Sequence, residues 1–170
     1  MTTRIVEGGA VWFRVPRYRV EPRARWWWMA RAALGTLTLL GVAGVLYLWF
    51  GGLRPWLGPP LVIGLVVSVL YVAIMPFWRY VVHRWEPTDE AVYARTGWYV
   101  REWRVAPISR IQTVDTSQGP IEQMMGLSTL AVTTASAHGA IYISGLDQAT
   151  AAEAAQRLTQ ITQLTPGDQT

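Results

Sequence analysis

The sequence has no cysteine, and its 15 basic residues are all arginine, so lysine is absent as well. Without cysteine, disulfides, thiolate catalysis and cysteine-ligated metals are excluded. The two histidines, His83 and His138, each stand alone, without a metal-binding spacing such as H-x-x-x-H. We expect His138 to be a solvated turn residue and His83 to pack near the point where the chain leaves the membrane. The sequence therefore predicts no metal, no cofactor and no catalytic residue.

Charge is also scarce, because only 15% of the residues are charged whereas 51% are hydrophobic. Residues 32–50 and 56–78 contain no charged side chain. At about 1.5 Å of rise per residue, the first run spans roughly 28 Å, close to the hydrocarbon thickness of a bilayer of roughly 30 Å. Helices buried in a soluble protein usually carry a polar stripe, which both runs lack. We therefore expect a hairpin of two transmembrane helices, and the arginine-rich arm before the first run argues against a cleavable signal peptide.

The arginines flank this hairpin unevenly. Six lie within residues 14–31 and three within 79–95, whereas the intervening loop, 51–55, holds only Arg54. The positive-inside rule then predicts a multi-pass membrane protein with both termini in the cytoplasm. Tryptophans mark the expected membrane boundaries, where interfacial aromatic belts form: Trp26, Trp27, Trp28, Trp49, Trp56 and Trp78.

After residue 78 the pattern changes to short β segments and a final helix. Apolar and polar residues alternate within the segments, and turn residues such as Thr96-Gly97 separate them. We expect six strands, at 79–85, 91–95, 99–105, 112–117, 130–133 and 141–144. The connector 136–139 joins the last two as a hairpin. One helical turn is expected at 121–125, ended by Gly126. The C-terminal helix is expected to start at a cap formed by Asp147 or Thr150 and to end at Pro166-Gly167.

These elements predict an α+β membrane protein. The transmembrane hairpin precedes an antiparallel β barrel or sandwich of pleckstrin-homology (PH) shape, which is capped by the C-terminal α-helix. Because that fold has seven strands, one strand is missing from the six expected here. The expected organisation is a basic cytoplasmic arm at 1–31, transmembrane helices at 32–50 and 56–78, an external loop at 51–55, a cytoplasmic PH-like domain at 79–165 and a tail at 166–170.

A series of short motifs runs through the soluble half in a fixed order. They are VAPISRIQTV at 105–114, QGP at 118–120, GLSTLAVTTA at 126–135 and GL at 145–146, preceded far upstream by YRVEPRA at 18–24. With these motifs the chain resembles the bacterial PH-like membrane proteins of the YdbS type. The positions that carry the resemblance most specifically are Arg110, Ile111, Gln112, Gln118, Gly119, Pro120, Gly126 and Leu127.

The resemblance implies a PH-like domain without known catalysis that is tethered to the bacterial cytoplasmic (inner) membrane. Such a protein is often encoded beside a larger relative that carries several such domains. In some bacteria such pairs are linked to tolerance of membrane-active peptides. The family does not specify a ligand, because PH-like folds bind lipid, peptide and protein alike.

The carboxylates give little support to catalysis. Asp89 and Glu90 fit a turn between strands. Asp115 lies in an expected strand, where pairing with Arg110 or Arg104 is a commoner role than chemistry. A membrane enzyme therefore stays a remote alternative, which a cleft shared by Asp115, Glu122 and His138 would revive.

One basic and aromatic cluster is left after the membrane flanks are assigned. The sequence pI of about 9.8 raises the possibility of nucleic-acid binding. The membrane flanks explain most of the positive charge, so no nucleic-acid partner is expected. The remaining cluster is a candidate contact for lipid or for a partner, with a solvated strand face as the alternative, and strand alternation puts Arg104 on the opposite face from Arg101 and Trp103. Its members are Arg95, Trp98, Arg101, Trp103 and Arg104.

The preferred hypothesis is a non-catalytic, membrane-anchored PH-like binding or scaffold protein, an accessory component of an inner-membrane complex. Its expected partners are membrane lipids and another membrane protein or a larger multi-PH-domain relative, because tethering lets weak contacts suffice. The alternative is anionic-lipid binding, or a role in membrane stress or antimicrobial-peptide tolerance.

Overall fold

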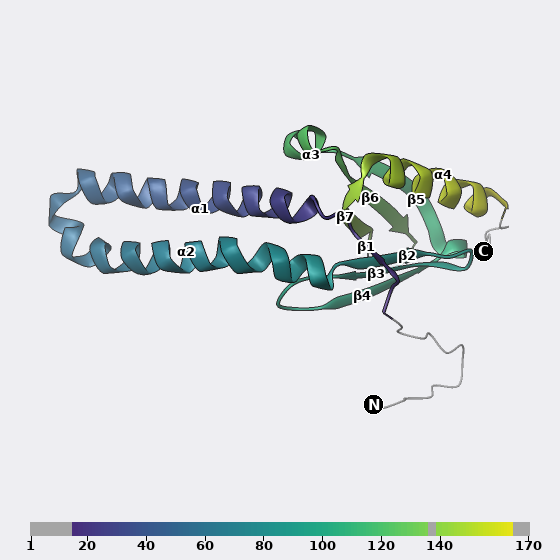
Figure 1. The fold of residues 1–170 in the computed structure, drawn as a ribbon, viewed down its shortest axis with the longest axis horizontal. Coiled ribbons are helices and arrows are strands. Elements are labelled where there is room, and N and C mark those ends of the chain that lie inside the picture. The colour runs from purple at the N-terminus through teal and green to yellow at the C-terminus, as the bar shows by residue number, and fades with distance from the viewer. Residues whose placement is uncertain (1–14, 136–138, 165–170) are drawn as a thin grey trace, which may run out of the picture.

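The computed structural model describes residues 15–135 and 139–164. Two long helices lie side by side at one end of the molecule, and two β-sheets with the C-terminal helix form the other end (Figure 1). The first part of the expected arm, the connector residues 136–138 with His138, and the segment with Pro166-Gly167 and the tail lie outside the described residues.

The two helices are longer than the uncharged runs that predict them. Helix α1 covers Ala24–Trp49, a short 3-10 turn covers Gly51–Leu53, and α2 covers Arg54–Val82. Both are long and apolar enough to cross a membrane. Each extends past its uncharged run toward the sheets, because arginine is a good helix former and a charged residue ends the apolar run without ending the helix.

Seven strands form two antiparallel sheets. The first sheet has the order β1 (Tyr18–Arg19), β2 (Arg84–Pro87), β3 (Ala91–Thr96) and β4 (Glu102–Pro107). The second has the order β5 (Ile111–Ser117), β6 (Leu127–Thr134) and β7 (Ile141–Asp147). A 3-10 turn at Ile108–Arg110 joins the sheets, α3 (Pro120–Met125) connects β5 to β6, and α4 (Gln148–Leu164) follows β7.

The strand missing from the sequence prediction is β1, which precedes both long helices. Tyr18 pairs with Trp85 and Arg19 with Arg84, so the chain enters the domain before it leaves for the membrane helices. Residues 18–24 therefore belong to the PH-like fold and not to a separate arm. The α+β, PH-like fold is confirmed, but the two sheets form a sandwich and do not close into a barrel.

Four strand predictions were wrong by three residues or more at one end, and two of these strands are longer than expected: β6 starts at Leu127 instead of Leu130, and β7 ends at Asp147 instead of Ser144. Residues 79–82 continue helix α2, and His83 N–H still donates to the Arg79 carbonyl oxygen at 2.8 Å, so β2 starts only at Arg84. Strand β4 starts at Glu102 instead of Tyr99. For the C-terminal helix, the choice between two caps is settled in favour of Asp147, whose Oδ2 accepts the N–H of Ala149 at 3.0 Å.

The start of α1 is part of the hydrophobic core of the domain. Ala24, Trp27 and Trp28 are buried in the same cluster as Leu127 of β6 and Leu158 of α4. The membrane helix and the sandwich therefore share one core.

A bulge in β7 makes room for this helix start. Ser128 pairs with Leu146 and Thr129 with Ser144, which leaves Gly145 as the extra residue. Its φ is +84°, and a Cβ added there would lie 2.6 Å from the Cβ of Ala24. The Gly145 carbonyl oxygen also accepts the N–H of Glu21 at 2.9 Å. Only glycine meets both the backbone angle and the close approach.

We predict that Gly145→Ala lowers the free energy of unfolding by about 2–4 kcal/mol, because it combines left-handed strain with overpacking against Ala24. The matched control is Gly139→Ala, where φ is +71° but no atom lies within 4 Å of the added Cβ. This control carries the strain alone, so a loss of about 1 kcal/mol is expected. Thermal unfolding in detergent measures both, and equal losses would show that the contact with α1 contributes nothing.

Candidate membrane-contact site

The turn between β3 and β4 folds back along helix α2. The indole N–H of Trp78 donates to the carbonyl oxygen of Trp98 at 2.8 Å. The rings of Trp98 and Tyr71 pack edge to face, with centroids 5.8 Å apart. Figure 1 shows this hairpin reaching from the sheet toward the side on which the long helices extend. Two residues of α2, seven positions apart, thus hold the hairpin against the helix.

The hairpin turn is wider than the two-residue turn expected at Thr96-Gly97. It runs over residues 97–101, between the end of β3 and the start of β4. Gly97 has a φ of +101°, and a Cβ there would lie 1.9 Å from the carbonyl oxygen of Val100. Glycine is therefore required for the chain to reverse over the aromatic residues that contact α2.

Three apolar side chains at this turn face outward, and we call them the hairpin tip: Trp98, Tyr99 and Val100. Their exposed fractions are 43%, 85% and 65%. Large apolar side chains gathered at one exposed point are unusual on a soluble surface and mark contact with a membrane or a partner. The hairpin tip continues the apolar surface of α2 onto the domain.

Arginines lie directly behind the hairpin tip. The Arg101 guanidinium carbon lies 6.0 Å from the centre of the Trp78 ring, and that of Arg95 lies 5.7 Å from the centre of the Trp103 ring. Arg95 also donates to the Val82 carbonyl oxygen at 3.1 Å. Burial, followed by the charges of Arg101 and Arg84, lowers the pKa of Arg95. These cations therefore repel one another, and the cluster favours an anionic ligand.

Arg104 differs from the other four candidate contact residues. Its guanidinium donates to the Ala140 carbonyl oxygen at 3.0 Å and pairs with Glu102 at 3.1 Å. Arg104 thus connects the first sheet to the start of β7. This agrees with the strand alternation, which places Arg104 on the opposite face of β4 from Arg101 and Trp103. The sequence analysis left Tyr71, Tyr99 and Val100 out of the contact set. The signal for Tyr99 and Val100 was an aromatic and apolar triplet directly after Gly97, whereas Tyr71 lies within the uncharged run of α2 and carries no such signal.

The residues that carry the family resemblance build the α3 loop and the adjoining core. Gly119 is the N-cap residue of α3, and its N–H donates to the buried carboxylate of Glu122 at 2.7 Å. The Thr129 hydroxyl donates to the same carboxylate at 2.8 Å. Gly126 ends α3 in the left-handed conformation. The remaining positions are Pro120 at the first turn of α3, Gln118 bonded to the Leu127 carbonyl oxygen, the buried Ile111 and Leu127, the exposed Arg110, and Gln112 at a bulge in β5.

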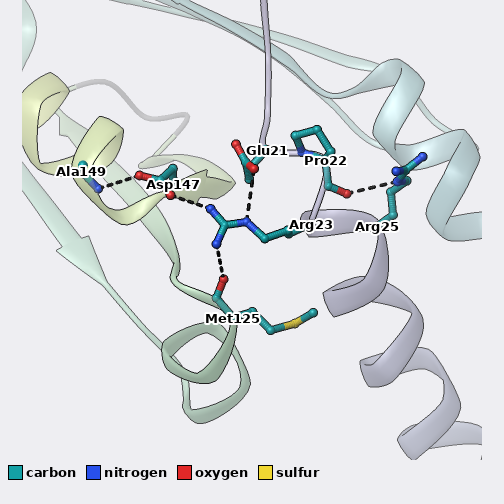
Figure 2. Close-up of polar contacts among 7 residues, drawn as sticks. All are labelled: Glu21, Pro22, Arg23, Arg25, Met125, Asp147 and Ala149. Carbon is teal, nitrogen blue, oxygen red and sulfur yellow. Dashed lines mark hydrogen bonds and ion pairs between the residues drawn. The ribbon is translucent and has the colours of Figure 1, made fainter.

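The same loop holds the segment that precedes α1 (Figure 2). Arg23 donates to Asp147 at 2.7 Å, to the Met125 carbonyl oxygen at 3.0 Å and to Glu21 at 3.2 Å. The hydrogen bond to Glu21 is the main cause of the raised pKa of Arg23, and Asp147 adds to it. Arg23 therefore joins the start of α1 to α3 and to the β7–α4 junction.

A membrane enzyme would need Asp115, Glu122 and His138 in one cleft, but both carboxylates have other partners in the described part of the chain. Asp115 is exposed and accepts a hydrogen bond from Thr113 at 3.0 Å, in place of the arginine that we expected. Glu122 is occupied at the start of α3, and His138 lies outside the described residues. Asp89, at the turn before β3, pairs with Arg157 of α4 at 2.8 Å.

His83 lies at the junction where α2 passes into β2. Its ring is 3% exposed and its centroid lies 5.1 Å from that of Trp28, so the expected packing role is observed. Burial and, second, the charge of Arg79 lower the pKa of His83 from 6.5 to about 3. His83 is therefore a neutral ring between the two long helices and the first sheet.

The fold defines a class: a membrane protein in which two long apolar helices share a core with a PH-like sandwich. A family model described as "Bacterial PH domain" matches residues 31–162, and the chain belongs to that family. It is 29% identical over 123 residues to the "UPF0699 transmembrane protein YdbS" of Bacillus subtilis (strain 168), covering 71% of this chain and 77% of that protein. No solved structure matches the chain.

We predict that the buried His83 makes the protein sensitive to acid. Because the unfolded chain takes up this proton near pH 6.5 and the folded chain only near pH 3, stability falls as the pH drops through that window. Between pH 7 and pH 5 the loss is about 2 kcal/mol. His83→Phe keeps a ring against Trp28 and should remove this loss in thermal unfolding at the two pH values.

The matched control is His138→Gln, which removes the other histidine and should keep the wild-type pH dependence. An unchanged acid loss in His83→Phe would contradict the assignment to His83.

Proposed function

We propose that this protein is a non-catalytic, membrane-anchored binding protein that holds its PH-like domain flat against the cytoplasmic leaflet of the inner membrane. Helices α1 and α2 cross the bilayer as a hairpin with both termini in the cytoplasm. The observation that carries the proposal is the contact of the hairpin tip with α2, through Trp98 on Tyr71 and Trp78.

The depth of this contact supports insertion of the hairpin tip into lipid. Trp78 ends the uncharged run of α2, and Tyr71 lies seven residues further into that run. At 1.5 Å per residue, this separation is about 10 Å along the helix. With Trp78 at the interface, a side chain that also reaches Tyr71 enters the upper part of the hydrocarbon core. Tyr99 and Val100, the most exposed residues of the tip, extend beside it.

Charge supports the same placement. Arg84, Arg95 and Arg101 lie behind the hairpin tip, at the level where headgroup phosphates are found in this arrangement. Each such arginine near an anionic leaflet contributes about 1 kcal/mol. The uneven distribution of arginines around α1 and α2 supports the cytoplasmic side.

Docking of the hairpin leaves the opposite part of the domain for a partner. A cavity of about 310 Å³ lies between β2 and α4, lined by Tyr18, Trp85, Pro87, Thr150 and Glu153 together with other residues of α4. We assign this cavity to contact with another membrane protein, such as a larger relative with several PH-like domains. Because both proteins are confined to one membrane, weak contacts suffice through effective concentration.

Insertion of the hairpin tip predicts that position 99 lies in lipid. The chain has no cysteine, so Tyr99→Cys carries a single spin label in proteoliposomes. Its electron paramagnetic resonance relaxation should be dominated by oxygen, which concentrates in acyl chains, over a water-soluble nickel complex. Tyr142→Cys on β7 is the matched control, because Tyr142 is 60% exposed and should contact the nickel complex. Equal access of the nickel complex to both labels would contradict insertion.

The partner assignment predicts cross-linking from one face. A photo-crosslinking residue at Thr150, which lines the cavity, should yield one discrete larger species in native membranes, identifiable by mass spectrometry. The same residue at Tyr142 should not yield that species. A protein that remains uncrosslinked from position 150 and purifies alone in every mild detergent would overturn the partner assignment but not the docking of the hairpin.

A further inference from the structure

Three residues at the join of α1, α2 and β2 each carry a buried nitrogen atom that has no hydrogen-bond partner among the described residues. These atoms are Nε1 of Trp28, Nε of Arg79 and Nδ1 of His83. The Arg79 guanidinium carbon lies 4.6 Å from the centre of the Trp28 ring, and the Trp28 and His83 centroids lie 5.1 Å apart. We call these three residues the junction cluster. Trp28 and His83 are only 2% and 3% exposed, so bulk water does not solvate their ring nitrogens.

The chemistry of the junction cluster calls for an acceptor. Trp28 Nε1 and Arg79 Nε carry hydrogens and can only donate, whereas His83 Nδ1 donates or accepts according to its tautomer. Buried donors without acceptors are costly, and such groups in native proteins usually mark a bound water or ion. Each of these donors therefore calls for an acceptor oxygen that the described residues do not supply.

The charges around the junction cluster favour an anion over a water molecule. Arg31 extends the positive charge toward α1, and its guanidinium carbon lies 5.4 Å from the centre of the Trp27 ring. Arg25 lies 5.5 Å from the centre of the Tyr80 ring. In the described part of the chain, none of Arg25, Arg31 and Arg79 forms an ion pair with a carboxylate. Water would satisfy the donors but would leave three neighbouring cations without a counter-charge.

The position of the junction cluster identifies the class of anion. It lies at the ends of α1 and α2 that adjoin the domain, beside Trp27 and within one helical turn of Trp78. Tryptophans at helix ends mark the headgroup region of a bilayer, where phosphate is the anion at highest density. Arginine binds phosphate through several N–H donors at once.

We infer that the junction cluster, with Arg31, binds the phosphate group of an anionic phospholipid headgroup between α1 and α2. This site rests on the proposed membrane placement of the two helices, but it shares no residue with the hairpin tip. A lipid held there contacts both membrane helices and the start of β2, so its phosphate becomes part of the joint between the membrane and the domain.

The test uses the full-length protein purified in mild detergent, with native mass spectrometry to count bound lipids. Phosphatidylglycerol, phosphatidylcholine and inorganic phosphate are titrated separately. The wild type should retain one phosphatidylglycerol in preference to phosphatidylcholine. Arg79→Gln should weaken this binding about tenfold or more, as expected for loss of a charged hydrogen bond. Trp28→Phe keeps one aromatic ring and removes the indole N–H together with part of the buried ring system, so a loss of severalfold is expected.

The matched control is Arg54→Gln. Arg54 lies at the other end of α2 and also stacks on an aromatic ring, 5.9 Å from the centre of Tyr47, so its replacement should leave this binding unchanged. Wild-type retention of phosphatidylglycerol in both Arg79→Gln and Trp28→Phe would overturn the inference. The inference would also be overturned if the thermal unfolding midpoint of these two variants fell equally in phosphatidylglycerol and in phosphatidylcholine. That result would give the junction cluster a packing role alone.

The inorganic phosphate arm separates the two sources of the ligand. If millimolar inorganic phosphate does not displace bound phosphatidylglycerol, the result supports a lipid headgroup as the ligand. Binding of inorganic phosphate in place of the lipid would overturn the headgroup assignment. Neither result depends on where a label on the hairpin tip resides, so this inference and the proposed function fail separately.

Discussion

Both long helices are rooted in the core of the soluble domain, and the orientation of the whole molecule depends on this shared root. Trp28 of α1 is buried with Leu127 and Leu158, and α2 passes into β2 through the single buried residue His83. No flexible linker therefore separates the helices from the sandwich. Rotating the domain against the helices would expose a tryptophan and open the core, at a cost of several kcal/mol.

Rigid attachment changes what a tether does. A domain on a flexible linker gains effective concentration but must still lose orientational freedom when it binds. In this protein the hydrogen bond between Trp78 and the hairpin, and the ring contact of Trp98 with Tyr71, add a third point of attachment. These three attachments fix the orientation of the domain and, with it, the direction in which the cavity beside α4 faces.

The sequence predicts the elements that repeat a pattern over many residues. The uncharged runs predict α1 and α2, and alternation predicts the sheets, because both patterns reflect burial summed over a whole element. Strand β1 has only two residues, Tyr18 and Arg19, which show no period, and its partner Trp85 lies 67 positions away in the chain. The wide turn after Gly97 was missed because a glycine turn does not reveal that helix α2 lies beneath it. The junction cluster joins residues of two helices that, in the sequence, merely flank the membrane.

Arginines in this protein are held in two different ways. Arg23, Arg104 and Arg157 of the domain each pair with a carboxylate. At the helix ends the guanidinium groups of Arg25, Arg31, Arg54 and Arg79 lie over aromatic rings instead. An aromatic ring orders the guanidinium through its quadrupole without neutralising the charge. The ring can also lie beside apolar lipid at no cost, whereas a carboxylate placed there would have to be desolvated. Cations held in this way keep their charge for an external anion, and a bilayer supplies phosphate at that depth on every side.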